Sequence, residues 1–376
     1  MTARRIVRLS HGWIGVILGL FIVLVAGSGA CLAFVSEMFL VQFGEMLEAQ
    51  APTPGASYVE IDAMIAAAQI ARGKAFTIQG IMMPHTRLSK VSTALVYGVE
   101  KGGDPAFPIE VSVDPWTGAA KGSFSLADAF GHDLLDFHHE LLLGEIGVTF
   151  VSALGVLLML FALSGLWLWW PRKGSTWRRA LSPGLKGSGT NKLFQLHVWL
   201  GIWTALLVTL FALTGAATVR PNWFGPLLDD MHEREPRGGV WSKACEGATS
   251  FSDAAKQAVS RFPGKQVSTI CVMPGEPIHV YLRGPGDVNT MQGDSLAWVH
   301  PSCDGVIETV DASLQSTPEW LGSTVFTLHG GYSFGPFVGP ILVLVTGLSL
   351  VFFAVSGIIV FFTRTWRPSA RAQPHQ

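Results

Sequence analysis

The sequence predicts a helical membrane protein with four transmembrane helices, arranged as two repeats of a helix, an outer α+β domain and a second helix. Hydrophobic residues make up 49% of the 376 positions, and the mean hydropathy is +0.39. Four apolar stretches, 13–34, 146–170, 194–219 and 337–362, are each long enough to cross a bilayer, which takes about 20 helical residues. Short motifs then recur in both halves of the chain.

The first apolar stretch is expected to remain in the mature protein as a helix. A cleavable signal peptide has a shorter apolar region that ends in small residues at the cleavage site. Here the small residues Gly27-Ser28-Gly29-Ala30 are followed by more apolar sequence. We therefore expect a first transmembrane helix within residues 1–38.

Charge asymmetry predicts how the helices are oriented. All 27 acidic residues fall between Glu37 and Glu145 or between Asp229 and Glu319. Three segments are basic and contain no acidic residue, and basic segments remain on the cytoplasmic side of a membrane. In a bacterial inner membrane, both termini and the middle loop are thus expected inside and the two long segments in the periplasm. The basic residues are Arg4, Arg5, Arg8, Arg172, Lys173, Arg178, Arg179, Lys186, Lys192, Arg364, Arg367 and Arg371.

These signals divide the chain into helices, outer domains and cytoplasmic segments. The expected parts are a first transmembrane helix with a cytoplasmic N-terminus (1–38), a first periplasmic domain (39–137), a second transmembrane helix (138–171), a cytoplasmic loop (172–192), a third transmembrane helix (193–220), a second periplasmic domain (221–328), a fourth transmembrane helix (329–363) and a cytoplasmic tail (364–376).

The two outer segments show the same order of elements. Each begins with a helical pattern, at 58–71 and at 251–262, and Ser252 is a candidate N-cap of the second. Three strand-like runs follow in each half, bounded by Gly and Pro. These runs are 75–82, 94–100 and 109–114 in the first half and 266–273, 278–283 and 296–300 in the second. The repeat predicts two halves related by an axis along the membrane normal.

Histidines recur at matching places in the two halves. His11-Gly-Trp13-Ile-Gly15 and His197-Val-Trp199-Leu-Gly201 open the first and third apolar stretches, while His138-His139 and His329 precede the second and fourth. Imidazole near a membrane helix is costly unless it is hydrogen-bonded or ligates a metal. Helices of a bundle can hold a haem iron between two histidines. The pattern therefore predicts His11 with His197 at the inner face and His138, or His139, with His329 at the outer face.

Residues near these histidines fit the same hypothesis. Small residues would let a flat macrocycle or a neighbouring helix approach the backbone, and Arg8 and Lys192 could neutralise haem propionates. No C-x-x-C-H motif occurs, so the expected cofactor is haem b, in two copies. The small residues are Gly12, Gly15, Gly19, Gly144, Gly147 and Gly201.

The ordinary role of a single histidine at a helix end is that of a polar residue at the membrane surface. For His85, His232, His279, His300 and His375, which have no counterpart in the other half, a surface position is expected. Straight helices would also separate the outer from the inner histidines by roughly 45 Å at ~1.5 Å per residue. Breaks near 144–147 and 335–340 could bring the outer site closer, and His132, His139 and the methionines are alternative ligands.

The cysteines divide between membrane and outer segments. Cys31 lies within the first helix, where it is expected to be a small packing residue, and one disulfide is expected among Cys245, Cys271 and Cys303 in the oxidising periplasm. The sequence does not choose the pair. A zinc enzyme is disfavoured because His138-His139-Glu140 lacks the H-E-x-x-H spacing.

At these motifs the chain resembles the PepSY-associated transmembrane family over almost its whole length. The resemblance rests on the H-x-W-x-G motif, on Val113-Asp-Pro-Trp-Thr-Gly118 and on His138-His-Glu-Leu-Leu-Leu-Gly144, followed by Ser164-Gly165-Leu-Trp-Leu-Trp-Trp-Pro-Arg172. Within the family the chain is most similar to inner-membrane ferrisiderophore reductases, the ferrioxamine reductases among them. In the second half, Leu328-His329-Gly-Gly lacks the charged residues that follow His138.

The resemblance implies PepSY-like outer domains and two haem groups that pass electrons across the membrane to a ferric hydroxamate siderophore, which releases Fe(II). It also implies His11, His138, His197 and His329 as the iron ligands. The siderophore is expected to dock near an aromatic cluster. This cluster consists of Trp223, Phe224, Trp241, Trp320, Tyr332 and Phe334.

The partners follow from what the sequence contains and lacks. No Rossmann or flavin motif occurs, so electrons must come from a quinol in the membrane lipid or from a cytoplasmic donor. The net charge of −1 gives no basis for binding nucleic acid. The alternative function is a haem-free periplasmic binding or regulatory module, or a siderophore permease, anchored by the four helices.

Overall fold

The structure is a computed structural model of the whole chain. It describes residues 2–86, 88–104, 107–171, 181–182, 184–228, 247–273, 275–303, 305–311 and 316–365. Two compact units form: a helical unit of residues 1–33, 135–223 and 340–376, and a sheet unit of residues 34–134 and 224–339.

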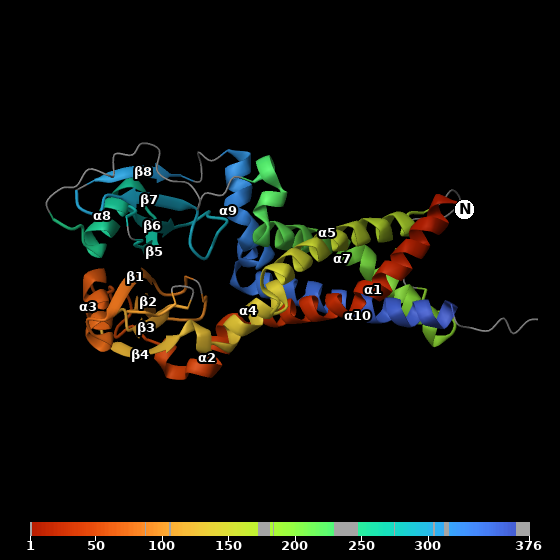
Figure 1. Cartoon of the computed structure of the whole chain (residues 1–376), viewed down its shortest axis with the longest axis horizontal. Coiled ribbons are helices and arrows are strands. Elements are labelled where there is room, and N and C mark those ends of the chain that lie inside the picture. Colours follow the sequence, from red (N-terminus) through yellow and green to blue (C-terminus); the bar gives the residue numbers. More distant parts are fainter. Residues whose placement is uncertain are drawn as a thin grey trace, which may run out of the picture. The chain divides into compact units, whose positions relative to one another are not determined.

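The helical unit contains the four long apolar helices that the sequence predicts. These are α1 (Ala3–Leu32), α5 (Gly144–Trp169), α7 (Gly189–Val219) and α10 (Gly335–Thr365) (Figure 1). Each is long and apolar enough to cross a membrane. The prediction of a membrane protein with four spans is therefore confirmed.

Glycines bring the helices of opposite halves into close contact. A Cβ atom added at Gly155 of α5 would lie 2.7 Å from the carbonyl oxygen of Ala212 in α7. A Cβ atom added at Gly347 of α10 would likewise lie 2.7 Å from the carbonyl oxygen of Ala26 in α1. Small residues of this kind let membrane helices pack backbone to backbone. The same contact is thus used twice, once in each half.

The sheet unit is built on one antiparallel sheet of eight strands, in the order β4-β3-β2-β1-β5-β6-β7-β8. The pairing of β1 with β5, in which Ile81 lies opposite Ile270, joins the two halves. The sequence predicted three strands in each segment, but each has four, and the two segments share one sheet. The strands are β1 (Phe76–Met82), β2 (Ala94–Glu100), β3 (Ile109–Val113), β4 (Ala120–Ser125), β5 (Gln266–Cys271), β6 (Ile278–Arg283), β7 (Ser295–Val299) and β8 (Val306–Val310).

Two helices cover one face of this sheet. Met64 and Ala68 of α3 (Ile61–Arg72) and Ala254 of α8 (Phe251–Arg261) are fully buried in one core with the alternate strand residues. Ser250 caps α8 by accepting a hydrogen bond from the Asp253 N–H. Ser252, the expected cap, lies inside the helix, and its hydroxyl accepts a bond from the backbone N–H of Asp62 in α3.

Short helices complete the fold. They are α2 (Val35–Phe43), α4 (Phe130–Glu140) and α9 (Thr317–His329), with the 3₁₀ turns η1 (Gly44–Leu47), η2 (Leu126–Asp128), η3 (Pro221–Trp223), η4 (Gly225–Leu227) and η8 (Tyr332–Phe334).

The outer histidines lie on separate short helices before the second span of each half. Leu141, Leu142 and Gly144 have positive φ between α4 and α5, and Gly331 and Gly335 have positive φ between α9 and α10. The expected breaks therefore exist. The second and fourth long helices begin at Gly144 and Gly335, later than the boundaries of 138 and 329 expected from the sequence.

Candidate functional site

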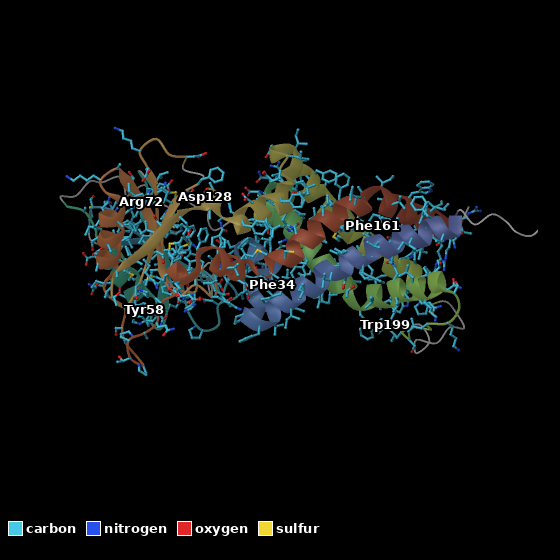
Figure 2. All side chains as sticks on the ribbon, turned by 90° about the horizontal axis from the view of Figure 1, so that it is seen from below. Phe34, Tyr58, Arg72, Asp128, Phe161 and Trp199 are labelled. Carbon is cyan, nitrogen blue, oxygen red and sulfur yellow. The ribbon has the colours of Figure 1, made fainter. Side chains whose placement is uncertain are left out.

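His11 of α1 forms a side-chain hydrogen bond with the neighbouring helix of its own half. Its Nδ1 lies 2.8 Å from Oγ of Ser164 in α5, and that hydroxyl donates to the carbonyl oxygen of Phe161 at 2.8 Å. The Phe161 ring, labelled in Figure 2, packs on the imidazole with ring centres 4.9 Å apart. Gly165 leaves room for the ring edge, since a Cβ atom there would lie 3.8 Å from His11 Cε1.

His197 of α7 repeats this arrangement in the second half. Its Nδ1 lies 2.8 Å from Oγ of Ser356 in α10, which donates to the Phe353 carbonyl oxygen at 3.3 Å. The Phe353 ring packs on the imidazole at 5.2 Å, and a Cβ atom at Gly357 would lie 3.6 Å from His197 Cε1. Each half thus supplies the same histidine, serine, phenylalanine and glycine.

The hydrogen bonds are compatible with a hydrogen on Nδ1 of each imidazole. A serine hydroxyl has one hydrogen, and a backbone carbonyl can only accept. When Ser164 and Ser356 donate to the Phe161 and Phe353 carbonyl oxygens, each can accept a hydrogen bond only from Nδ1–H of its histidine. The lone pair is then on Nε2, which makes no hydrogen bond with the described residues in either histidine. This is the tautomer of a histidine that binds a metal through Nε2.

The surroundings of the two histidines fit a flat cofactor. A Cβ atom at Gly201, next to His197 along α7, would meet nothing within 4 Å, and one at Gly15 would meet only Phe161. Gly12 and Gly19 instead admit the Phe361 and Ile358 side chains of α10. The space beside Gly15 and Gly201 is what a flat macrocycle such as haem would need next to the two imidazoles.

Of the two adjacent outer histidines, His138 contacts α1. Its Nδ1 donates to the Val25 carbonyl oxygen at 2.9 Å and lies 3.1 Å from Ser28 Oγ. Its Cε1 would be 2.7 Å from a Cβ atom at Gly29. His139 donates instead to the Leu135 carbonyl oxygen of its own helix at 2.8 Å. His138 thus has the Nδ1 hydrogen bond of a metal ligand, as His11 and His197 do.

His329 is the last residue of α9, followed by Gly330 and by Gly331 at positive φ. It belongs to the sheet unit, whereas His138 belongs to the helical unit. Each unit is described by itself, so the His138–His329 pairing remains a prediction. Among the described residues, no group of three or more His, Cys, Asp or Glu side chains could hold a metal ion.

Comparison with known protein families identifies the family of this chain. The family described as PepSY-associated TM region matches residues 8–364. The chain belongs to this family. No curated protein matches it, so the narrower similarity to ferrisiderophore reductases remains a prediction.

The cysteines of this PepSY-associated protein differ from one another in state. Cys303 is in a disulfide, whereas Cys271 of β5 is a free thiol. Cys245 lies outside the described residues. Cys31 is exposed on α1, so the prediction that it is a packing residue is wrong. The thiol of Cys271 accepts a hydrogen bond from the Tyr97 hydroxyl at 3.0 Å, and burial raises the pKa of both groups.

Two of the histidines expected at the surface are buried. His279 of β6 is 8% exposed and His300, after β7, is 6% exposed, because both lie on or beside a covered strand. His85 is exposed, and its imidazole donates from Nδ1 to the Ser89 carbonyl oxygen. His232 and His375 lie outside the described residues.

The structure does not bring together the aromatic residues that were expected near the siderophore, and it shows no partner among the described residues for the basic residues that were expected near the haem propionates. The expected aromatic residues divide between the two units, and Trp241 lies outside the described residues. Arg8 and Lys192 are exposed, and their side chains make no hydrogen bond or ion pair in the described part of the chain. Ser164-Gly165 and Ser356-Gly357 are matching Ser-Gly pairs near the ends of the second and fourth apolar stretches, but nothing in that pattern indicates that the serines bond to histidine.

Proposed function

We propose that this protein is a di-haem inner-membrane reductase that passes electrons to a ferric hydroxamate siderophore in the periplasm. The observation that carries the proposal is the repeated His–Ser pair, His11 with Ser164 and His197 with Ser356. A neutral imidazole with its Nδ1–H occupied and its Nε2 lone pair available is what an iron ligand requires. One such pair is unremarkable, but its recurrence at matched positions on facing halves indicates a shared ligand.

In the proposed mechanism, the protein residues hold and orient the haem groups. A b-type haem would supply reversible one-electron transfer through its iron. His11 and His197 would hold the inner haem, and His138 and His329 the outer one. Ser164 and Ser356 would orient the inner imidazoles, and the basic Arg8 and Lys192 would balance the negative propionates at the cytoplasmic end.

The substrate class follows from ligand chemistry and from the expected orientation. Hydroxamate oxygens are hard ligands, which hold Fe(III) tightly and Fe(II) weakly, so one-electron reduction releases the metal. Electrons would enter at the basic cytoplasmic end, from a quinol or a cytoplasmic donor, and leave at the periplasmic end.

The test is to purify the protein in detergent, record dithionite-reduced minus oxidised spectra and quantify haem as the pyridine haemochrome. We expect two b-type haems per chain. His11→Ala or His197→Ala should remove one haem and leave the other, and His329→Ala should affect only the outer one. His85→Asn, in an exposed loop at a positive φ that asparagine tolerates, is the control.

A colourless protein that remains so after haem supplementation would end the reductase hypothesis. That result would favour the alternative function, which is a haem-free binding or regulatory module or a siderophore permease.

A further inference from the structure

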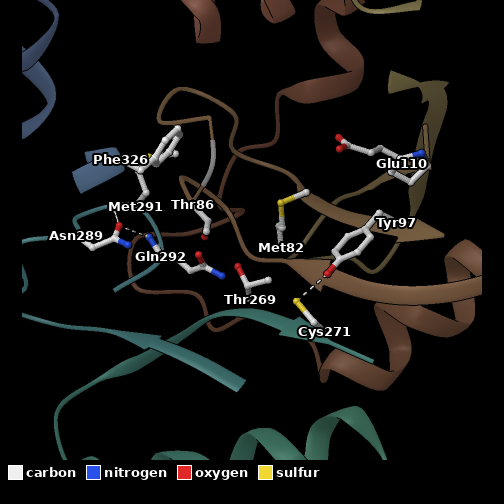
Figure 3. A pocket seen from close by; sticks show the side chains of 11 residues that line it. Met82, Thr86, Tyr97, Glu110, Thr269, Cys271, Asn289, Met291, Gln292 and Phe326 are labelled. Carbon is white, nitrogen blue, oxygen red and sulfur yellow. Dashed lines mark hydrogen bonds between the residues drawn. The ribbon is translucent and has the colours of Figure 1, made fainter. Parts of the chain in front are cut away.

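A cavity of about 370 Å³ lies in the sheet unit where the two halves of the sheet meet (Figure 3). Its floor is the sheet face opposite α3 and α8, contributed by Met82 of β1, Tyr97 of β2 and Thr269 of β5. The loop between β6 and β7 and Phe326 of α9 provide the other wall. No residue of the transmembrane site takes part in it.

The floor is shaped by a glycine. Gly80 of β1 lies between Tyr97 of β2 and Cys271 of β5 in the strand register. A Cβ atom at Gly80 would collide with the Tyr97 ring, which reaches across the glycine to bond Cys271. The missing side chain therefore lets a tyrosine from the first half contact a cysteine from the second.

The loop wall is held rigidly. The carboxylate of Asp294 accepts hydrogen bonds from the backbone N–H groups of Val288 at 2.6 Å and Asn289 at 2.9 Å. The Asn289 Oδ1 atom accepts two more, from the N–H groups of Met291 at 3.2 Å and Gln292 at 3.0 Å. These bonds determine the orientation of the Asn289 amide, so its Nδ2 group is a preorganised donor at the cavity.

Polar groups that line the cavity lack partners. Thr269 is 5% exposed and Asn289 is 8% exposed, yet the Thr269 hydroxyl and the Asn289 Nδ2 group make no hydrogen bond with any described residue. The side-chain amide of Gln292, on the same wall, makes none either. These atoms are not among the fully buried polar atoms of the described residues that lack a partner, so they are open to the cavity and available to a molecule bound there.

The lining selects the kind of ligand. Asn289 and Thr269 can donate, while Gln292 and Tyr97 offer oxygens that can accept. Met82, Met291 and Phe326 contribute apolar surface between these groups. The described lining residues include no lysine or arginine, and their one charged member is Glu110, which is 2% exposed and adds carboxylate oxygens that accept hydrogen bonds. A neutral chain that carries both amide-type donors and acceptors and methylene groups meets all of these requirements.

We infer that this cavity binds a neutral amide- or hydroxamate-bearing aliphatic chain. On the proposed function, on which this identification rests, the chain is part of the organic frame of the siderophore. The volume is at the lower end of the range for small-molecule sites, about 300–1,000 Å³. The cavity therefore takes one arm of a trihydroxamate, not the whole complex.

The experiment measures binding separately from reduction. The full-length protein in detergent is titrated calorimetrically with the Ga(III) complex of a linear trihydroxamate, which has the charge of the ferric complex but is not reduced. We expect Thr269→Val, which keeps the side-chain shape, to weaken binding about tenfold. Gln292→Leu should do the same, and Ser260→Ala on the surface of α8 should bind like the wild type.

Each outcome has a distinct meaning. If the complex binds the wild type and both variants equally, the cavity inference is overturned and the proposed function stands. If the complex does not bind a protein that carries two haems, the cavity inference and the siderophore substrate are both overturned, and only the di-haem assignment stands. If binding is weakened by both variants but the protein holds no haem, the cavity inference stands and the reductase function falls. Thermal melting of each variant shows whether the weakening comes from misfolding.

Discussion

At the residue scale, the serine beside each inner histidine decides whether the imidazole can bind a metal. Ser164 lies 153 residues from His11 in the sequence, and their bond closes only when α1 packs on α5. The hydroxyl can accept from Nδ1–H, which leaves Nε2 available for a metal when the imidazole is neutral. Without that acceptor the ring is free to rotate, or to move its hydrogen to Nε2, where it blocks coordination.

We therefore expect Ser164→Ala to weaken haem binding about 10- to 100-fold, as for other partners of metal-ligating histidines. Haem titration of the apoprotein, followed at the Soret band, measures the affinity, and electron paramagnetic resonance of the ferric protein reports the ligand orientation. Ser164→Thr keeps the hydroxyl and should restore both. Thr209→Val removes another helix hydroxyl, bonded only to the Ala205 carbonyl, and is the control. Unchanged affinity and spectra in Ser164→Ala would exclude a positioning role.

At the scale of single elements, the paired glycines on α5 and α10 determine how closely the halves approach. A Cβ atom at Gly347 would lie 2.7 Å from the Ala26 carbonyl oxygen and 2.8 Å from Ala30 Cβ. Backbone atoms cannot move aside as a side chain can. Gly347→Ala should therefore cost about 1–3 kcal/mol, in the range of overpacked cores.

The measurement is the thermal unfolding midpoint of the detergent-solubilised protein by circular dichroism. Gly155→Ala tests the equivalent contact with α7 and should have the same effect. Gly27→Ala is the matched control, because a Cβ atom there would meet nothing within 4 Å. If Gly347→Ala has the same unfolding midpoint as Gly27→Ala, the close contact does not hold the helices together.

The elements also show how far sequence reasoning reaches. The long helices were predictable because apolar length alone identifies a span. β4, whose sequence is Ala-Lys-Gly-Ser-Phe-Ser, was missed because an exposed edge strand lacks apolar alternation. The break after α4 uses positive φ at Leu141 and Leu142, although leucine favours helices, so tertiary structure overrides the local preference there.

The site was predictable only in part, for a related reason. Repeated motifs identified His11 and His197, because recurrence at matched positions is visible in the sequence. The partners Ser164 and Ser356 and the cavity residues Thr269 and Asn289 become neighbours through packing between distant segments. The union of both outer segments in one sheet depends likewise on the β1–β5 pairing, which no local pattern specifies.

At the scale of the whole molecule, duplication and charge together predict one orientation. Four spans place both ends of the chain on the same side, and the basic residues at both ends and in the middle loop predict that this side is the cytoplasm. The reversed orientation would carry these charges across the membrane against its potential. It would also place both the sheet unit and the Cys303 disulfide in a reducing compartment.

Cysteine labelling in intact cells tests this orientation. In a background with Cys31 and Cys271 replaced by alanine, the Ser57→Cys variant should react with a membrane-impermeant maleimide, because Ser57 is exposed in the outer segment. The Ser182→Cys variant, exposed in the middle loop, should react only after the cells are permeabilised. The variant with only Cys31 and Cys271 replaced by alanine measures the labelling that does not come from the introduced cysteine. The opposite labelling pattern would reverse the direction of electron flow proposed here, and equal labelling of both variants in intact cells would contradict the four-span arrangement itself.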